Sequence, residues 1–231
     1  MLEFSFFDHQ SDLQALKKRL EGVLGVAPAG SRLDPTSQFV RAFIASRTYD
    51  VVSSRAFARL VARYRSWDEV AASSQRDLAS VLAGVTYREE KAANLKGALR
   101  TIRARSGAID LEFLADLPVE TGLLWLENIY GVGRKIAAAT LNFSTLRKRA
   151  FVIDTHILRV MRRYGFVGPR ADTMAVYDAV MASAQGFEAD DLYVLHWQLK
   201  TLGQRICRHA QVSCESCPLS DVCLRRLEKA A

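Results

Sequence analysis

A glycine-rich turn followed by a lysine is the segment of this chain best suited to chemistry. In residues 126–137 (LENIYGVGRKIA) an apolar helical run ends near Ile129, Gly131 and Gly133 form a turn, and a new helix begins at Arg134. Glycines let backbone amides approach a phosphate closely, and a helix N-terminus presents unpaired N–H groups. A plain connection between two helices would explain the glycines equally well. The glycines alone therefore do not indicate a phosphate-binding turn, and the residues that follow must be considered with them.

Lys135 stands in the first turn of the new helix. A positive charge is unfavourable at this end of the helix dipole, where acidic side chains are preferred. A solvated surface lysine or a simple phosphate contact would account for it structurally. The chemical alternative is an amine whose charged form the dipole destabilises, which leaves more neutral amine to act as a nucleophile.

Asp154 lies in the segment 152–156 (VIDTH), where an apolar run gives way to polar residues before another helix. An aspartate in this position is typical of a helix N-cap, and that role alone would explain it. A carboxylate held at a helix N-terminus also stays ionised, so it can stabilise a positive charge that develops nearby.

The cysteines are confined to the C-terminal end of the chain and form the pattern C-x6-C-x2-C-x5-C. They are Cys207, Cys214, Cys217 and Cys223. The tight Cys214–Cys217 pair suits two ligands on one metal centre. No export signal is recognisable at the N-terminus, so we expect metal ligation rather than disulfides. The spacing leaves both structural zinc and an iron–sulfur cluster open.

The elements that must position these residues are helices. Apolar residues recur at helical spacing, as in Leu13, Leu16 and Leu20, and the pattern predicts an all-α protein of about ten helices joined by short loops. Asp34 before a proline and Ser66 before two acidic residues predict helix starts. Alternating runs typical of strands are nearly absent.

Composition narrows the class of protein. The 231 residues are 49% apolar, and 32 basic against 25 acidic residues give a formal net charge of +7. This apolar content excludes a disordered chain, and no apolar run is long enough to span a membrane. We expect a cytoplasmic protein without a targeting signal. The basic charge makes a polyanion the first partner to consider, although a well-solvated surface would explain it too.

The order of these motifs resembles that of a known family. The glycine turn with Lys135, the segment 153–156 (IDTH), the pair His196 and Trp197, and the four-cysteine pattern follow one another as in endonuclease III. The chain is therefore identified as similar to the helix-hairpin-helix DNA glycosylases over residues 34–223. The resemblance implies two helical domains flanking a DNA-binding groove: a bundle at 34–145 that ends in the hairpin, and a discontinuous domain at 1–33 and 146–231 that carries the cluster.

The resemblance also implies roles for single residues. Lys135 would attack C1′ of a damaged nucleotide and form a Schiff base, and Asp154 would assist it and stabilise the developing positive charge. Gly131, Gly133 and Arg134 would bind DNA, and the four cysteines would ligate a [4Fe-4S] cluster. The implied protein is a monomeric, nucleoid-associated DNA glycosylase and abasic-site lyase. Its partner is double-stranded DNA with a damaged base, by default an oxidised pyrimidine, flipped out of the duplex, or with an abasic site.

Two positions depart from the family pattern. Arg47 stands where the family has a glutamine that fills the gap left by the flipped base, and an arginine there should change the preference for the opposite base. Tyr87, in a segment about two residues longer than the family's, is the candidate wedge between base pairs, with a packed aromatic as the alternative. The loop between Cys207 and Cys214 is also less basic than in the family.

Competing functions remain at this point. Lys135 argues against an enzyme that removes adenine opposite oxidised guanine and against a monofunctional glycosylase for uracil or thymine mismatches. The alternative of a different class is a non-catalytic helix-hairpin-helix and iron–sulfur module that recognises distorted duplex. We expect His156 and His196 to be structural. The basic residues at 147–149 and Arg159, Arg162 and Arg163 are expected to face DNA.

Overall fold

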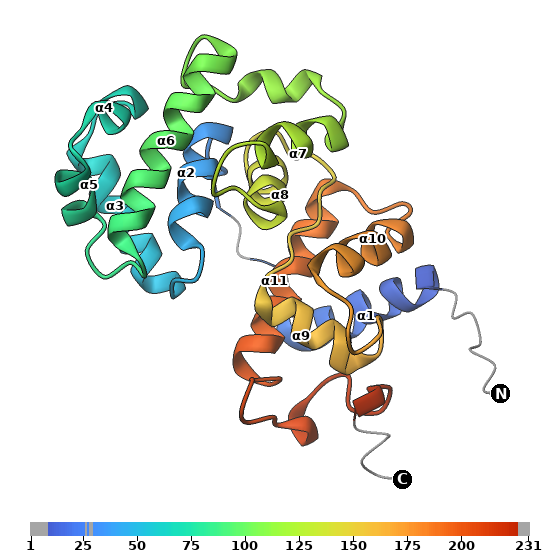
Figure 1. Cartoon of the computed structure of the whole chain (residues 1–231). Coiled ribbons are helices and arrows are strands. Elements are labelled where there is room, and N and C mark those ends of the chain that lie inside the picture. Colours follow the sequence, from blue (N-terminus) through green and yellow to red (C-terminus); the bar gives the residue numbers. More distant parts are fainter. Residues whose placement is uncertain (1–8, 26, 28–29, 226–231) are drawn as a thin grey trace. The chain divides into compact units, whose positions relative to one another are not determined.

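The computed structural model describes residues 9–25, 27 and 30–225, with side chains from residue 12 onward. Within these ranges the chain forms eleven α-helices, two short 3-10 helices and no strand, so the all-α prediction is confirmed (Figure 1). The extended segment 151–153 joins no sheet, and the described residues contain one isolated β-bridge, between Cys207 and Val212. None of the helices that these ranges contain is both long and apolar enough to cross a membrane.

The chain divides into two compact units, Ser31–Lys148 and Met1–Gly30 together with Arg149–Ala231. The domain boundaries expected from the sequence, at 34 and 145, lie within a few residues of these limits. Residues 1–8, 26, 28–29 and 226–231 of the expected discontinuous domain lie outside the described residues. We refer below to residues 31–148 as the hairpin unit and to the other as the cysteine unit.

The hairpin unit is a bundle around the long helix α6. Its helices are α2 (Pro35–Ala45), α3 (Asp50–Arg63), α4 (Trp67–Ala72), α5 (Gln75–Val81), α6 (Arg88–Ser106), the 3-10 helix η1 (Glu112–Asp116), α7 (Val119–Glu127) and α8 (Arg134–Phe143). Helix α6 packs against α4, α5 and α2, and α2 in turn packs against α8. Fully buried Phe39 and Ile44 on α2 and Leu95 and Leu99 on α6 form much of this core.

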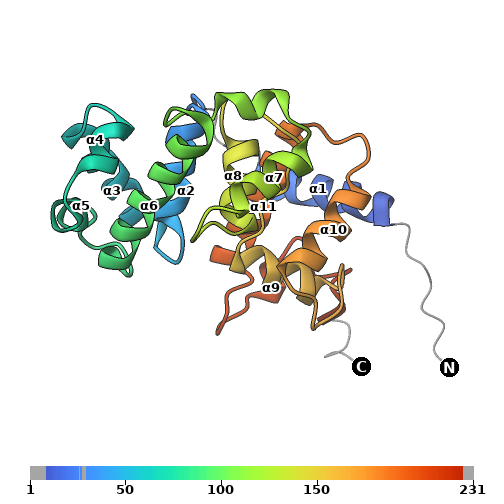
Figure 2. The same ribbon diagram turned by 45° about the horizontal axis from the view of Figure 1, so that its top comes forward.

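In the cysteine unit, two segments far apart in the sequence share one core. Helix α1 (His9–Leu24) packs against α10 (Thr173–Ser183) and α11 (Ala189–Arg205), and α11 also packs against α9 (Thr155–Tyr164), as Figure 2 shows. The 3-10 helix η2 (Cys214–Ser216) lies in the cysteine segment. Leu13, Leu16 and Leu20 are fully buried, as their helical spacing predicts.

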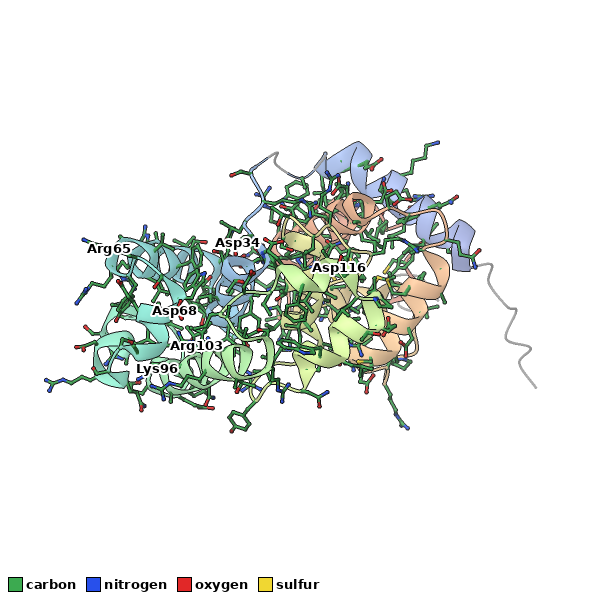
Figure 3. All side chains as sticks on the ribbon, turned by 90° about the horizontal axis from the view of Figure 1, so that it is seen from above. Asp34, Arg65, Asp68, Lys96, Arg103 and Asp116 are labelled. Carbon is green, nitrogen blue, oxygen red and sulfur yellow. The ribbon has the colours of Figure 1, made fainter. Side chains whose placement is uncertain are left out.

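Helix starts agree with the local sequence signals. Asp34, labelled in Figure 3, caps α2 by accepting a hydrogen bond from the backbone N–H of Ser37 at 2.8 Å, and Pro35 occupies the first helical position. Ser66 caps α4 through a hydrogen bond from the Glu69 backbone N–H at 3.2 Å. Both starts were expected from these residues, so this part of the prediction is confirmed.

The Asp34 cap gives a stability prediction. The substitution Asp34→Ala leaves the first turn of α2 without its side-chain acceptor and should lower the free energy of unfolding by about 1 kcal/mol. Asp34→Asn keeps an acceptor in the same place and should lower it by much less. Urea unfolding followed by circular dichroism measures both variants, and equal losses would show that the cap does not stabilise α2.

Candidate active site

The turn before α8 is held against two neighbouring helices. Gly131 has a φ of +82°, which favours glycine. A Cβ at this position would lie 3.4 Å from Cζ of Phe43 on α2 and 3.8 Å from Cβ of Asn94 on α6. Gly133 is exposed and has ordinary extended geometry, and a Cβ there would meet no described atom within 4 Å. Protein packing therefore explains Gly131, whereas Gly133 leaves its backbone open to a ligand.

Helix α8 begins directly after this turn and carries Lys135 in its first turn. No acidic residue lies in that turn, and the N-cap Gly133 has no side chain with which to cap the helix. Lys135 is half-buried. The preceding Arg134 forms ion pairs with Glu127 at 2.7 Å and Glu120 at 3.4 Å, both on α7. Arg134 thus joins α7 to α8, a role in addition to the DNA contact that the sequence predicts.

Lys91 is the residue of this site that sequence reasoning overlooked. Its Nζ donates hydrogen bonds to the carbonyl oxygen of Ile44 at 3.0 Å, to the hydroxyl of Thr48 at 3.0 Å, and to the carbonyl oxygen of Ser46. Burial lowers the pKa of Lys91 to about 8, and the positive charges of Lys135 and Arg47 contribute to the shift. A lysine on a surface helix is ordinarily solvated, so the position of Lys91 in the sequence does not predict that its ammonium is half-buried and hydrogen-bonded.

Arg47 and Tyr87 lie on two turns that a hydrogen bond joins. The Thr48 hydroxyl accepts a hydrogen bond from the backbone N–H of Thr86 at 3.3 Å, and Lys91 binds the same hydroxyl. Both Arg47 (φ +53°) and Tyr87 (φ +55°) have left-handed backbone conformations, which are strained for residues other than glycine. Both are exposed, and Tyr87 retains 60% of its accessible surface. The alternative of a packed Tyr87 is therefore wrong.

Asp154 in the cysteine unit caps α9, as its position in the sequence predicts. One oxygen of its carboxylate accepts hydrogen bonds from the backbone N–H groups of His156 at 2.8 Å and Ile157 at 2.9 Å. Burial raises the pKa of this carboxyl. The His196 imidazole, the Ile157 amide and the Lys200 ammonium lower it by more, together with His156, so the pKa lies below its ordinary value. Asp154 is therefore a buried, ionised carboxylate near neutral pH.

The surroundings of Asp154 depend on a close approach of α11 to α9. A Cβ on Gly203 would lie 2.8 Å from Cβ of His156 and 3.2 Å from its carbonyl oxygen, so a larger residue requires these helices to shift. His196 is buried on α11, and its Nδ1 donates to the carbonyl oxygen of Val152 at 2.7 Å. This contact agrees with the structural role expected for His196. Gly203 was overlooked, although a lone glycine inside a helical pattern was a usable signal.

The four cysteines line one cavity of about 30 Å³ and form no disulfide. Burial raises the pKa of the Cys217 thiol, and the three other cysteines raise it further. Among the side chains that the structure describes, no three Cys, His, Asp or Glu residues converge closely enough to form a ligand group as they stand. Four thiols that face one small cavity nevertheless suit a metal centre with sulfur ligands.

The basic residues expected to face DNA mostly donate hydrogen bonds to backbone carbonyl groups. Arg149 donates to the carbonyl oxygens of Phe187 at 2.6 Å and Ala184 at 2.9 Å, and Lys148 donates to that of Leu117. In the cysteine unit, three further arginines donate to carbonyl oxygens of α11, of the loop after α9 and of the cysteine segment. Arg159 donates to Gly203 and Cys207, Arg162 to Ala171, and Arg163 to Arg208 and His209. These hydrogen bonds give the residues a structural role that sequence reasoning did not anticipate.

The predicted residues therefore fall into two sets. The hairpin unit holds Lys135 with Gly131, Gly133 and Arg134, and it holds Arg47 and Tyr87 on the two turns that Lys91 and Thr48 join. The cysteine unit holds Asp154 and the four cysteines.

Comparison with known proteins identifies the family of this site. Residues 40–184 match the HhH-GPD superfamily, described as base excision DNA repair proteins. The chain belongs to this superfamily. The match covers the glycine turn, Lys135 and Asp154, and the resemblance found in the sequence motifs is confirmed.

Individual curated relatives match different shares of the chain. The DNA glycosylase/AP lyase ROS1 of Arabidopsis thaliana is 25% identical over 171 residues, which are 68% of this chain and 12% of ROS1. Endonuclease III of Sulfolobus acidocaldarius is 32% identical over 116 residues, 49% of each chain. This chain thus spans about half or less of the length of these curated relatives.

Solved structures of other proteins share the fold. A trapped covalent intermediate of endonuclease III with DNA superposes with a TM-score of 0.78 at 18% identity, and the match covers 96% of this chain and 99% of that one. At this level of identity the likeness establishes the fold alone.

The Asp154 cap gives a pH-dependent prediction. Because folding lowers the pKa of this carboxyl, its ionised form stabilises the cysteine unit above a pH of about 4, and that contribution is lost as the pH falls through the folded pKa. Asp154→Asn can still accept the cap hydrogen bonds but cannot ionise. We expect wild type to be more stable than Asp154→Asn at pH 7 and the difference to shrink on acidification.

Thermal unfolding at a series of pH values measures this difference. Asp154→Ala serves as the comparison, because it removes the cap as well and should lose about 1 kcal/mol more at every pH. A constant gap between wild type and Asp154→Asn would contradict the ionised state of Asp154.

Proposed function

We propose that this chain is a base-excision-repair DNA glycosylase with an associated abasic-site lyase activity, in which Lys135 forms a Schiff base with the sugar of the damaged nucleotide. The observation that carries the proposal is the placement of Lys135. Its amine is half-buried in the first turn of α8, which contains no acidic residue. This helix begins directly after a turn that packs on α2 and α6. Membership of a base excision repair superfamily supports it.

The names of two relatives point to the same chemistry in those proteins. ROS1 is a DNA glycosylase/AP lyase, and endonuclease III has been trapped in a covalent intermediate with DNA. A trapped covalent intermediate requires a nucleophile on the protein, and Lys135 is the residue of this chain that the motif and the geometry offer for that role.

The proposed reaction begins when the neutral Lys135 amine attacks C1′ of a flipped nucleotide. The N-glycosidic bond breaks, its electron pair leaves with the base, and the base takes up a proton. The attached amine then loses a proton, the C1′–O4′ bond breaks and O4′ takes up a proton, so that a protonated imine joins Lys135 to C1′. C2′ next releases a proton to water, its electron pair forms the C2′–C3′ double bond, and the bond between C3′ and its oxygen breaks as the 3′ phosphate leaves. Hydrolysis of the imine finally releases Lys135.

Asp154 has the properties that the first step requires. Burial raises the pKa of its carboxyl, but nearby positive groups and the Ile157 backbone N–H lower it by more, so the carboxyl is ionised near neutral pH. An ionised carboxylate stabilises the positive charge that develops on the sugar as the base leaves. The backbone amides of the Gly131–Gly133 turn would bind a DNA phosphate, because Gly133 leaves its backbone accessible.

The substrate in this proposal is double-stranded DNA with a damaged base, by default an oxidised pyrimidine, or with an abasic site, bound by a monomer. Arg47 and Tyr87 would contact the bases around the flipped nucleotide, since both are exposed on turns held in fixed positions. An arginine has several N–H donors for the unpaired opposite base, and an exposed tyrosine can stack on a base.

The cysteines Cys207, Cys214, Cys217 and Cys223 would hold a [4Fe-4S] cluster in the cavity that they line. Thiolates are the ligands that such clusters prefer, and a bound cluster supplies electron transfer and cross-links the C-terminal segment. Arg163 also holds the cysteine segment in place, because it donates hydrogen bonds to Cys207 Sγ at 3.5 Å and to the carbonyl oxygen of Arg208 at 2.7 Å.

Borohydride trapping tests the Schiff base. Wild type incubated with an abasic-site duplex and sodium borohydride should give a covalent protein–DNA adduct, and Lys135→Ala should give none because the nucleophile is missing. Lys18→Ala is the control, since Lys18 is an exposed lysine of the other unit. Duplex binding without any adduct from wild type would favour a non-catalytic DNA-binding module.

The metal content tests the cluster. Protein purified without oxygen should be yellow-brown and hold about four irons per chain. Cys217→Ala should lose colour and iron, because one of the four sulfur ligands is gone. Colourless wild-type protein with one zinc per chain would contradict an iron–sulfur cluster and favour a structural zinc site.

A further inference from the structure

We propose that Lys91 is a positioning residue for the Lys135 amine: its fixed, half-buried ammonium places a second positive charge beside Lys135 and so favours the neutral, nucleophilic form of that amine. The inference rests on the proposed function, in which Lys135 attacks C1′. It goes further by assigning a role to a lysine outside the hairpin motif.

The first observation is that Lys91 is anchored. Three oxygen acceptors surround its Nζ, namely the carbonyl oxygens of Ile44 and Ser46 and the hydroxyl of Thr48. None of these acceptors carries a charge, so the hydrogen bonds orient the ammonium without neutralising it. A lysine on a solvated helix face would instead sample many rotamers and place its charge in water.

The second observation is that the hairpin turn packs directly on the same helix face. Asn94 lies three residues after Lys91 on α6, so the two side chains share a face of the helix. A Cβ on Gly131 would lie 3.8 Å from Asn94 Cβ and 3.4 Å from Phe43 Cζ. The turn that begins α8 therefore rests beside the place where Lys91 is anchored, and Lys135 follows it within one helical turn.

The third observation concerns charge. The groups whose charges act on Lys91 are Lys135 on α8 and Arg47 on the turn after α2, and both are positive. Together with burial they lower the pKa of Lys91 to about 8. The α7 carboxylates Glu127 and Glu120 form ion pairs with the neighbouring Arg134. Three basic side chains thus gather at one corner of the hairpin unit.

The consequence for Lys135 follows because electrostatic coupling is reciprocal. If the charge on Lys135 disfavours the protonated form of Lys91, the charge on Lys91 disfavours the protonated form of Lys135 to a similar degree. Before attack, the Lys135 ammonium must release its proton to water. A neighbouring ammonium makes that release easier, as does the unfavourable end of the α8 dipole.

The test is the pH dependence of Schiff-base trapping on an abasic-site duplex. Lys91→Gln keeps hydrogen-bond donors for the 44–48 turn but removes the charge, so the midpoint pH of trapping should rise by about one unit. Lys91→Arg keeps the charge and should keep the low midpoint. Lys96→Met is the matched control, because Lys96 (Figure 3) also lies on α6 and donates to a carbonyl oxygen, that of Ser73.

A second measurement needs no DNA. Trace acetylation followed by mass spectrometry gives the pH at which Lys135 becomes reactive, with exposed Lys18 as an internal reference. In wild type, Lys135 should become reactive at a lower pH than Lys18. In Lys91→Gln, the difference between these two pH values should be smaller. If Lys91→Gln does not fold, a wild-type Lys135 that reacts like Lys18 still contradicts the proposal.

The possible outcomes separate the two proposals. An unchanged midpoint in Lys91→Gln, with only a slower rate or a lower melting temperature, would show that Lys91 merely anchors the 44–48 turn. If wild type forms no adduct but Lys135 acetylation shifts with Lys91, the charge coupling stands and the proposed glycosylase and lyase function is wrong.

Discussion

The packing of the Gly131 turn on Phe43 and Asn94 is the constraint on which the proposed chemistry depends. It fixes where α8 begins, and the beginning of α8 fixes Lys135. It also sets the start of α8 beside the α6 face that carries Lys91, whose ammonium ties the end of α2 to the Tyr87 turn through Thr48. The packing of Gly131 thereby brings together the proposed nucleophile Lys135, the ammonium of Lys91 and the turn of Arg47.

The cysteine unit is organised by a comparable contact. Gly203 lets α11 approach the first turn of α9, and the buried Asp154 receives the two backbone N–H groups at that helix start. The arginines of α9 bind carbonyl oxygens of the α11 end and the cysteine loop, so the ionised carboxylate and the cysteine cavity share one hydrogen-bonded framework. The arginines of α9 thus help to stabilise the fold of their own unit.

The helices and the motif residues could be predicted from the sequence because their signals are local. Asp34 and Asp154 are N-caps whose hydrogen-bond donors lie two or three residues later in the sequence. The helical spacing of leucines likewise shows which face of a helix is buried. The role of Lys91 could not be predicted in this way, because its hydrogen-bond acceptors belong to a turn that meets α6 only in the folded chain. Gly203 could be suspected as a lone glycine in a helical pattern, but the helix that it lets approach could not. For the same reason the hydrogen bonds from the α9 arginines to carbonyl groups far away in the sequence could not be predicted.

The central claim is that Lys135 forms the covalent bond to the sugar. Peptide mapping by mass spectrometry of the borohydride-trapped wild-type adduct tests it most directly, because it identifies the modified residue itself. The account predicts a single modified peptide with the deoxyribose remnant on Lys135. An adduct on Lys91, on the N-terminal amine or on any other lysine, with Lys135 unmodified, would contradict it.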